Sequence, residues 1–155
     1  MFKTNSLFFS YNTSTYFRFP DVKIAAGEDL LILGESGIGK TTFLHLMAGL
    51  LRPQSGSVAL LDTAFERLTS SKLDLFRGQH IGLVFQRPHF VSALKLRENL
   101  QLVQYLSGKK KHVNSIENIT NRLGIAHKLE EKTQRMSQGE QQRAAIALAL
   151  INNPE

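Results

Sequence analysis

Short apolar runs separated by polar turns dominate the first 87 residues and predict strands. Pro20 interrupts the second run, so that stretch is expected to form an edge strand or two short strands. The third and fifth runs are the most uniformly apolar and predict buried strands. The predicted strands cover residues 7–11, 16–24, 29–33, 57–61 and 81–85.

Apolar residues spaced three and four apart predict helices. The first helix is expected at 41–51, with Phe43, Leu44, Met47, Leu50 and Leu51 on one face, and one or two helical turns are expected at 68–76. From Lys95 onward strand signals disappear. Three further helices are predicted there. One has the face Leu96, Asn99, Leu100, Val103 and Leu106, and the next has the face Ile116, Ile119 and Leu123 and ends at Gly124. The last begins after Ser137 and stops before Pro154.

The candidate chemistry is concentrated between two of these elements. Residues 34–41 read Gly-Glu-Ser-Gly-Ile-Gly-Lys-Thr, the G-x-x-x-x-G-K-[ST] phosphate loop, placed between a predicted strand and a predicted helix. Its glycines let backbone N–H groups turn toward phosphate oxygens, and the helix that follows adds its positive N-terminal end. Lys40 is expected to reach the β- and γ-phosphates, and the Thr41 hydroxyl to ligate Mg²⁺.

A second candidate anion site comes about a hundred residues later, in the stretch Met-Ser-Gln-Gly-Glu at 136–140. Ser137 and Glu140 have the spacing of a capping box, which would by itself explain both residues. A helix N-terminus with a serine hydroxyl is also suited to an anion. One phosphate loop and one spare anion site suggest a nucleotide bound between two copies of the chain.

Composition narrows the alternatives. The length of 155 residues fits one domain, and the lack of cysteine excludes a disulfide framework, a thiolate metal site and a cysteine nucleophile. We expect no signal peptide and no membrane-spanning segment. Lys and Arg exceed Asp and Glu by six, but the densest run, at 109–112, has no interleaved aromatic residues and is interpreted as a solvated connection, so nucleic acid is not an expected partner.

The order of these motifs resembles the nucleotide-binding domain of ATP-binding cassette (ABC) transporters over nearly the whole chain. Residues 34–42 match its Walker A loop, 84–86 its Q-loop, and 136–140 its signature, usually Leu-Ser-Gly-Gly-Gln; 97–100 resemble the segment after the Q-loop. Residues 75–86 are similar to the branch that serves lipoprotein release and macrolide-type export. The resemblance implies a P-loop NTPase α/β fold with an N-terminal antiparallel β part and an inserted helical subdomain. The expected divisions are a core at 1–87, the helical subdomain at 88–138 and the signature helix at 139–155.

The resemblance also implies roles for individual residues. Tyr11 would stack on adenine, with Tyr16 and Phe17 as competitors, and residues 90–100 would face a membrane subunit. Gln86 would complete the Mg²⁺ shell with Thr41 and sense the γ-phosphate. The phosphate-binding set is Gly34, Glu35, Ser36, Gly37, Ile38, Gly39, Lys40, Thr41 and Thr42, and the set that touches ATP on the opposite subunit is Ser137, Gln138, Gly139 and Glu140.

The chain departs from the family pattern at Gln138, Glu140 and Leu148, where the family usually has glycine, glutamine and arginine. Residues 153–155 resemble the turn before the Walker B strand, so the domain is interpreted as incomplete, and the Walker B aspartate and catalytic glutamate are not among these 155 residues. An unpaired apolar sheet edge is therefore expected, with weak nucleotide binding and negligible hydrolysis by this segment alone.

The leading hypothesis is the ATP-binding subunit of an ABC transporter, using ATP and Mg²⁺. It would work as a head-to-tail dimer on a transmembrane permease subunit, at the cytoplasmic face of the cell membrane. The alternatives are a soluble ABC-type ATPase that acts on nucleic acid or ribosomes, and a nucleotide-binding remnant without turnover. The sequence does not reveal the transported molecule.

Overall fold

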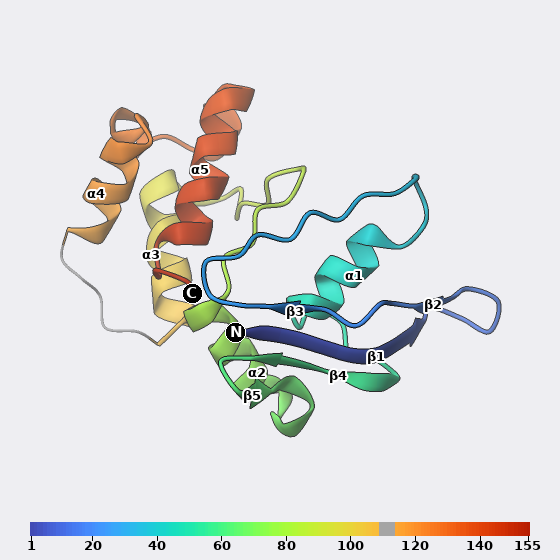
Figure 1. The fold of residues 1–155 in the computed structure, drawn as a ribbon. Coiled ribbons are helices and arrows are strands. Elements are labelled where there is room, and N and C mark those ends of the chain that lie inside the picture. Colours follow the sequence, from blue (N-terminus) through green and yellow to red (C-terminus); the bar gives the residue numbers. More distant parts are fainter. Residues whose placement is uncertain (109–113) are drawn as a thin grey trace. The chain divides into compact units, whose positions relative to one another are not determined.

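The computed structural model describes residues 1–108 and 114–155, so four residues of interest, the Lys-Lys-Lys-His run at 109–112, lie outside the described residues. The described chain forms two compact units, residues 1–73 and 74–155. The first unit contains the sheet and the phosphate loop, and the second contains the longer helices (Figure 1).

The first unit is built on a five-stranded antiparallel sheet. Its order is β2-β1-β4-β5. Strand β3 pairs with the start of β1, on the same edge on which β2 pairs with the end of β1. The predicted stretch 16–24 therefore forms two short strands, because the chain leaves β1 around Pro20 and returns. The strands are β1 (Phe2–Ser10), β2 (Tyr16–Arg18), β3 (Lys23–Ile24), β4 (Ser55–Leu60) and β5 (Thr63–Ala64).

Helix α1 (Lys40–Met47) covers one face of this sheet (Figure 1). A chain of ring contacts connects the two: Phe17 stacks on Phe19, and Phe19 stacks on Phe43 of α1 at 4.8 Å between centroids. Leu46 is fully buried, whereas Leu44, expected on the buried face, is half exposed. The unit also contains η1 (Phe65–Arg67) and the start of α2 (Ser70–His80), and its buried apolar residues are Leu7, Phe9, Phe43, Leu46, Ala48, Val58, Phe65 and Leu73.

The prediction of a buried strand at 29–33 is wrong. These residues form no strand, and Leu31 and Leu33 are 78% and 79% exposed. A strand of this kind needs hydrogen-bonded neighbours on its edges, and within the described residues no strand pairs with this segment. The unpaired apolar sheet edge expected from the sequence is not found at this segment: its leucines are exposed, but it forms no strand.

The second unit packs three helices around one apolar cluster: α3 (Leu96–Leu106), α4 (Ser115–Arg122) and α5 (Gln138–Leu150). Two short helical turns, η2 (Ala126–Lys128) and η3 (Thr133–Arg135), connect α4 to α5. The predicted faces are largely confirmed, except that Leu106 is 64% exposed. The cluster consists of Leu96, Leu100, Ile116, Ile125, Leu129, Met136, Ala144, Ala147 and Ile151, with Leu148 packed against it.

The predicted strand at 81–85 is also absent from the described structure. Gly82 lies so close to the end of α5 that an added Cβ would come within 2.5 Å of the Ala149 carbonyl oxygen. The run thus approaches the end of α5 at Gly82, while Val84 is 48% exposed, and no described strand pairs with it. Among the described residues, no helix is both long enough and apolar enough to cross a membrane.

Asn99 fixes the loop that precedes α3. The side chain is buried, its Oδ1 accepts from the Val91 amide at 2.9 Å, and its Nδ2 donates to the carbonyls of Val91, Leu94 and Lys95. The Val91 and Lys95 carbonyls also accept backbone amides, from Leu94 and Asn99, so the contribution specific to the Asn99 side chain is to the Val91 amide and the Leu94 carbonyl.

We expect Asn99→Ala to lower the free energy of unfolding by about 1–3 kcal/mol, because the Val91 amide and the Leu94 carbonyl lose their side-chain partner. The measurement is urea denaturation followed by circular dichroism. Asn118→Ala on the exposed side of α4 is the matched control, and a surface change of that kind is expected to stay within about 0.5 kcal/mol. Equal effects of the two substitutions would contradict this role.

Candidate nucleotide-binding site

The phosphate loop is closed by its own lysine. Lys40, the first residue of α1, folds its side chain back so that Nζ donates to the carbonyl oxygens of Gly34 at 2.7 Å and Glu35 at 2.5 Å. The Lys40 side chain thus connects the end of the loop with its beginning. A polyphosphate that enters the loop would meet this charge at the centre of the curve.

Gly39 sets the entry into α1. It adopts φ 99°, which favours glycine, and an added Cβ would lie 2.7 Å from the Phe17 ring. The N-terminus of α1 has no side-chain cap, so the first amides of the helix remain available to an anion. The aromatic ring of Phe17, on β2, therefore holds the loop close against the sheet.

Tyr11 lies beside the start of α1. Its hydroxyl is 3.1 Å from the Thr42 hydroxyl, its ring meets Phe9 edge-to-face at 4.8 Å between centroids, and the side chain is 58% exposed. Tyr16 instead lies against Phe8, at 6.3 Å between centroids. Phe17 packs over Gly39. Of the three aromatic candidates, Tyr11 is thus the one that combines an exposed ring with a contact to the phosphate-loop helix.

The capping box at the start of α5 is confirmed. The Ser137 amide donates to Glu140 Oε2 at 2.8 Å, and Ser137 Oγ accepts from the Glu140 amide at 3.3 Å. Ser137, Gln138 and Gly139 are exposed. Because Ser137 Oγ is used as an acceptor, its hydroxyl hydrogen can still be donated to an outside anion.

The metal candidates Thr41 and Gln86 belong to different units, and each is exposed in its own unit. Thr41 directly follows Lys40, so its hydroxyl lies at the helix end where phosphates would gather. Within the described residues, no group of three or more His, Cys, Asp or Glu side chains is arranged for a metal ion. Mg²⁺ is commonly held by few protein oxygens together with substrate phosphates and water, and a threonine hydroxyl beside a phosphate is a ligand of that kind. A Mg²⁺ site shared by Thr41 and Gln86 stays a prediction.

Two carboxylates after the Q-loop are held by one arginine. Arg97 Nη1 lies 2.6 Å from Glu117 Oε1, and Arg97 Nε lies 2.7 Å from Glu130 Oε1, which connects α3 with α4 and with the turn after η2. The hydrogen bonds from Arg97 lower the pKa of both carboxyl groups. A carboxyl with a lowered folded-state pKa stabilises the fold above its unfolded value, and that contribution is lost as the pH falls through the folded value.

We therefore expect Arg97→Met to lower the melting temperature at pH 7 and to make it less sensitive to acid below about pH 4.5, the ordinary carboxyl value. Melting curves recorded between pH 3 and 7 measure this. Arg135→Met, an exposed residue of η3, is the control and should follow the parent curve. If the parent and Arg97→Met curves stay parallel down to pH 3, Arg97 does not stabilise the ionised carboxylates.

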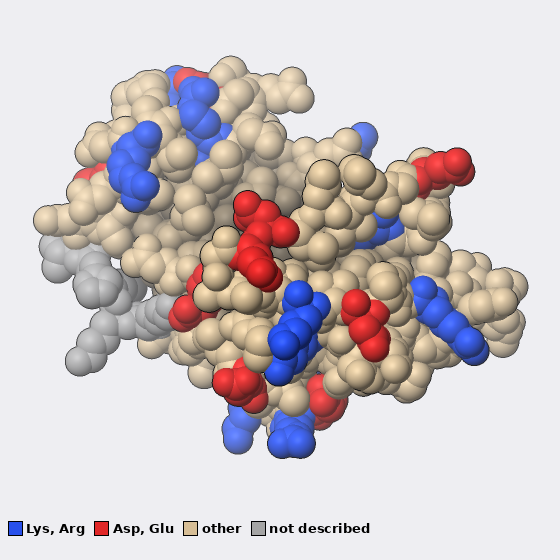
Figure 2. Space-filling model, in the orientation of Figure 1, with Lys and Arg blue, Asp and Glu red and all other residues tan. Residues whose placement is uncertain are grey.

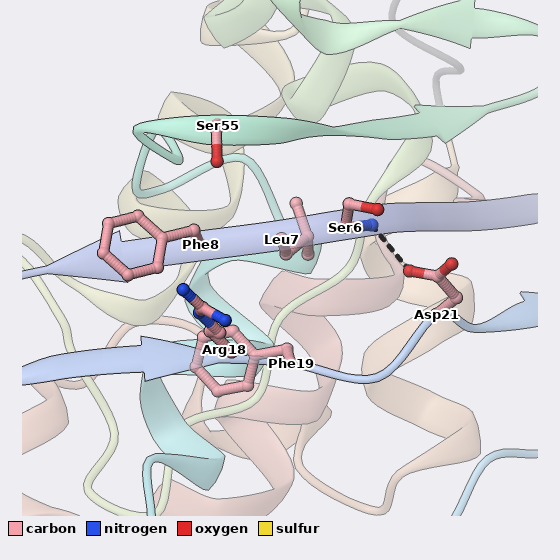
Figure 3. A pocket seen from close by; sticks show the side chains of 7 residues that line it. All are labelled: Ser6, Leu7, Phe8, Arg18, Phe19, Asp21 and Ser55. Carbon is pink, nitrogen blue, oxygen red and sulfur yellow. Dashed lines mark hydrogen bonds between the residues drawn. The ribbon is translucent and has the colours of Figure 1, made fainter.

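A cavity of about 530 Å³ opens beside the paired part of β1 and β2 (Figure 3). It exists because β1 has a bulge at Ser6, where φ is 47°, and because the chain departs from β1 around Pro20. Asp21 bridges the gap, its Oδ1 accepting from the Ser6 amide at 2.6 Å. The cavity is lined by Ser6, Leu7, Phe8, Arg18, Phe19, Asp21 and Ser55, none of them in the phosphate loop.

Some residues that shape the site carried no motif signal. The ring of Phe17 against Gly39 and the amide of Asn99 are visible once the fold is known. Leu148, a departure from the family pattern, packs against the apolar cluster of the second unit and so has a structural reason. For Phe17, the available sequence signal was the alternation in β2. For Asn99, it was the presence of a polar residue on an apolar helix face.

Comparison with known proteins agrees with these motifs. Residues 18–155 match the family model described as ABC transporter. The lipoprotein-releasing system ATP-binding protein LolD of Saccharophagus degradans is 35% identical over 136 residues, covering 86% of this chain and 60% of that protein. LolD of Cytophaga hutchinsonii is 33% identical over 154 residues, covering 98% of this chain and 70% of that protein. The chain thus spans about 60% of the length of several curated relatives that it matches.

Solved structures give the same fold. The dimeric ABC transporter cassette MJ0796 superposes with a TM-score of 0.88 at 27% identity, covering 99% of this chain and 71% of that chain. A post-hydrolysis state of MJ0796, bound to ADP and Pi, gives a TM-score of 0.89 at the same identity and coverage. With a phosphate loop, a capped signature helix and these matches in one order along the sequence, the chain belongs to the ABC transporter family.

Proposed function

We propose that this chain is the ATP-binding subunit of an ABC transporter, which couples ATP binding and hydrolysis to transport by a transmembrane permease partner. The observation that carries the proposal is the loop at 34–39 closed by Lys40 at an uncapped helix N-terminus. Such a loop offers backbone amides, a helix end and one ammonium group to a polyphosphate. The LolD relatives favour the lipoprotein-releasing branch for this chain.

The proposed division of work follows the residues. Lys40 exchanges its two carbonyl partners for phosphate oxygens, and the amides of 34–42 surround the phosphates. Thr41 and Gln86 would hold Mg²⁺, which would neutralise charge on the phosphates when bound. Tyr11 presents its exposed ring to adenine. We propose further that residues 1–87 form the nucleotide core, 88–138 the helical subdomain and 139–155 the signature helix.

A second copy of the chain would complete the nucleotide site. Ser137 and Gly139 are exposed at the start of α5, and the Ser137 hydroxyl hydrogen is available to an anion. In a head-to-tail dimer these groups would contact the γ-phosphate held by the partner. The MJ0796 relative is dimeric, which supports this arrangement.

The membrane test compares fractionation with and without the permease. We expect the chain to appear at the cytoplasmic face of the membrane fraction when its permease partner is co-expressed, and to leave that fraction when the permease is omitted. The 91–95 loop, fixed by Asn99, lies in the segment that would face the permease. Co-purification with ribosomes or RNA instead would support the soluble ABC-type alternative.

The charge on one face of the sheet-bearing unit bears on that alternative. On the face shown in Figure 2, Lys and Arg side chains are interspersed with Asp and Glu over the sheet-bearing unit. A phosphate backbone is usually bound by a stripe of one sign. The remaining alternative, a binding-only remnant, is separated by phosphate release at saturating ATP from a version of the chain that is extended through the Walker B strand: the remnant would show none.

A further inference from the structure

Glu140 uses both of its carboxylate oxygens. Oε2 accepts from the Ser137 amide at 2.8 Å and so completes the cap of α5. Oε1 lies 3.6 Å from Lys128 Nζ and 3.7 Å from His127 Nε2, both at the end of η2. One carboxylate therefore connects the signature serine to two potential cations on a neighbouring turn.

The connection is partly shielded from water. The Lys128 and Glu140 side chains are 20% and 16% exposed, and Lys128 also pairs with Glu131 at 3.1 Å. The Ser137 amide lowers the pKa of Glu140, and Lys128 and His127 add to this effect. Glu140 is thus ionised at neutral pH, and its Oε1 shares Lys128 with Glu131, to which Lys128 Nζ donates at 3.1 and 3.3 Å.

This pairing accounts for a departure from the family pattern. A glutamine at position 140 would cap Ser137 through its amide oxygen but would carry no charge for Lys128 to balance. A glutamate that lacked Lys128 would place an unbalanced negative charge three residues from a serine that is to meet a phosphate, and like charges repel. The negative charge of Glu140 is therefore expected to depend on the positive charge of Lys128.

We propose that Lys128 is a positioning residue for Ser137: through its ion pair with Glu140 Oε1, it holds the cap that aims the Ser137 hydroxyl at the γ-phosphate of the partner subunit. Lys128 itself touches no nucleotide in this scheme. The catalytic part of the proposal rests on the proposed function, whereas the orientation of Ser137 by Lys128 can be tested without it.

The first experiment measures hydrogen exchange of the Ser137 amide by NMR in the 155-residue chain. Lys128→Met is expected to raise its exchange rate at least threefold, because the Glu140 carboxylate is no longer held. Lys128→Arg, which keeps the charge, should restore the parent rate. Lys132→Met, on an exposed neighbour, is the matched control. An unchanged Ser137 amide in Lys128→Met would overturn the proposal, whatever the protein's activity.

The second experiment measures ATP turnover in a chimera that joins residues 1–155 to the part of the S. degradans LolD beyond the matched region. We expect Lys128→Met to lower kcat about tenfold with KM for ATP unchanged, which is modest against the ~100-fold that misplacing a catalytic contact by 1 Å can cost. In the Glu140→Gln background, Lys128→Met should cost less than twofold.

These outcomes separate the two ideas. An equal loss from Lys128→Met in the parent chimera and in the Glu140→Gln background would show that Lys128 does not act through the carboxylate, and the proposal would fall. If instead the chimera has no Lys40-dependent turnover, the proposed function fails, and the Ser137 exchange rate alone decides whether Lys128 positions the cap.

Discussion

Lys40→Ala is expected to weaken ATP binding by about 10- to 150-fold, the loss that follows from removing one charge-assisted contact worth ~1.5–3 kcal/mol. Lys40 is the group that spans the loop, from the start of α1 to the carbonyls of Gly34 and Glu35. No alanine side chain can supply either the charge or the reach. Isothermal titration of ATP with Mg²⁺ into the 155-residue chain measures the effect.

The control for Lys40→Ala is Lys72→Ala, an exposed lysine on α2 in which the same side chain is removed. Its expected change in affinity is less than twofold. Because Lys40 also holds the loop closed, the melting temperature of both variants is recorded, and a matched melting temperature assigns the affinity loss to the missing ammonium. ATP affinity that is the same in Lys40→Ala and Lys72→Ala would remove the basis of the proposed nucleotide site.

The second large effect concerns hydrolysis rather than binding. Residues 1–155 supply phosphate positioning and part of the charge neutralisation, whereas the family resemblance places the water-orienting carboxylate in a later strand. A positioned general base contributes about 10²–10⁴-fold to a rate. The LolD chimera is therefore expected to hydrolyse ATP at least 100-fold faster than the 155-residue chain at saturating ATP.

Steady-state phosphate release at saturating ATP measures that ratio. The control chimera carries amides in place of the acidic residues of the grafted Walker B segment, and it should fall to the rate of the 155-residue chain while it retains ATP affinity. Equal turnover by the 155-residue chain and the intact chimera would mean that a carboxylate among these residues already orients the water.

Local signals predicted the parts of this fold that depend on nearby residues. The capping box at Ser137 and Glu140 was readable because its atoms belong to residues three apart. The phosphate loop was readable because glycine spacing and Lys40 determine its closure within seven residues. The spacing of apolar residues predicted the buried helix faces in the second unit. The prediction was wrong at Leu106, because the position of a residue on a helix does not show whether another element packs against it.

The errors concern contacts between distant segments. The runs at 29–33 and 81–85 have the composition of buried strands, yet a strand depends on neighbours that composition cannot identify, and within the described residues neither run has one. The Phe17 ring over Gly39 and the pairing of Lys128 with Glu140 are likewise contacts between separate elements. Period and motif alone do not contain that information.

The held orientation of Tyr11 has a consequence for base selectivity. Its hydroxyl lies 3.1 Å from the Thr42 hydroxyl, its ring meets Phe9 edge-to-face and the side chain is 58% exposed, so in the proposed site the ring is in place before any base arrives. Stacking on such a ring is available to every nucleobase, because each has a π-surface and no edge of the base is read. GTP and ITP are therefore expected to compete with ATP at comparable concentrations, so in a cell the abundance of each purine triphosphate, rather than recognition of adenine, would decide which one occupies the loop.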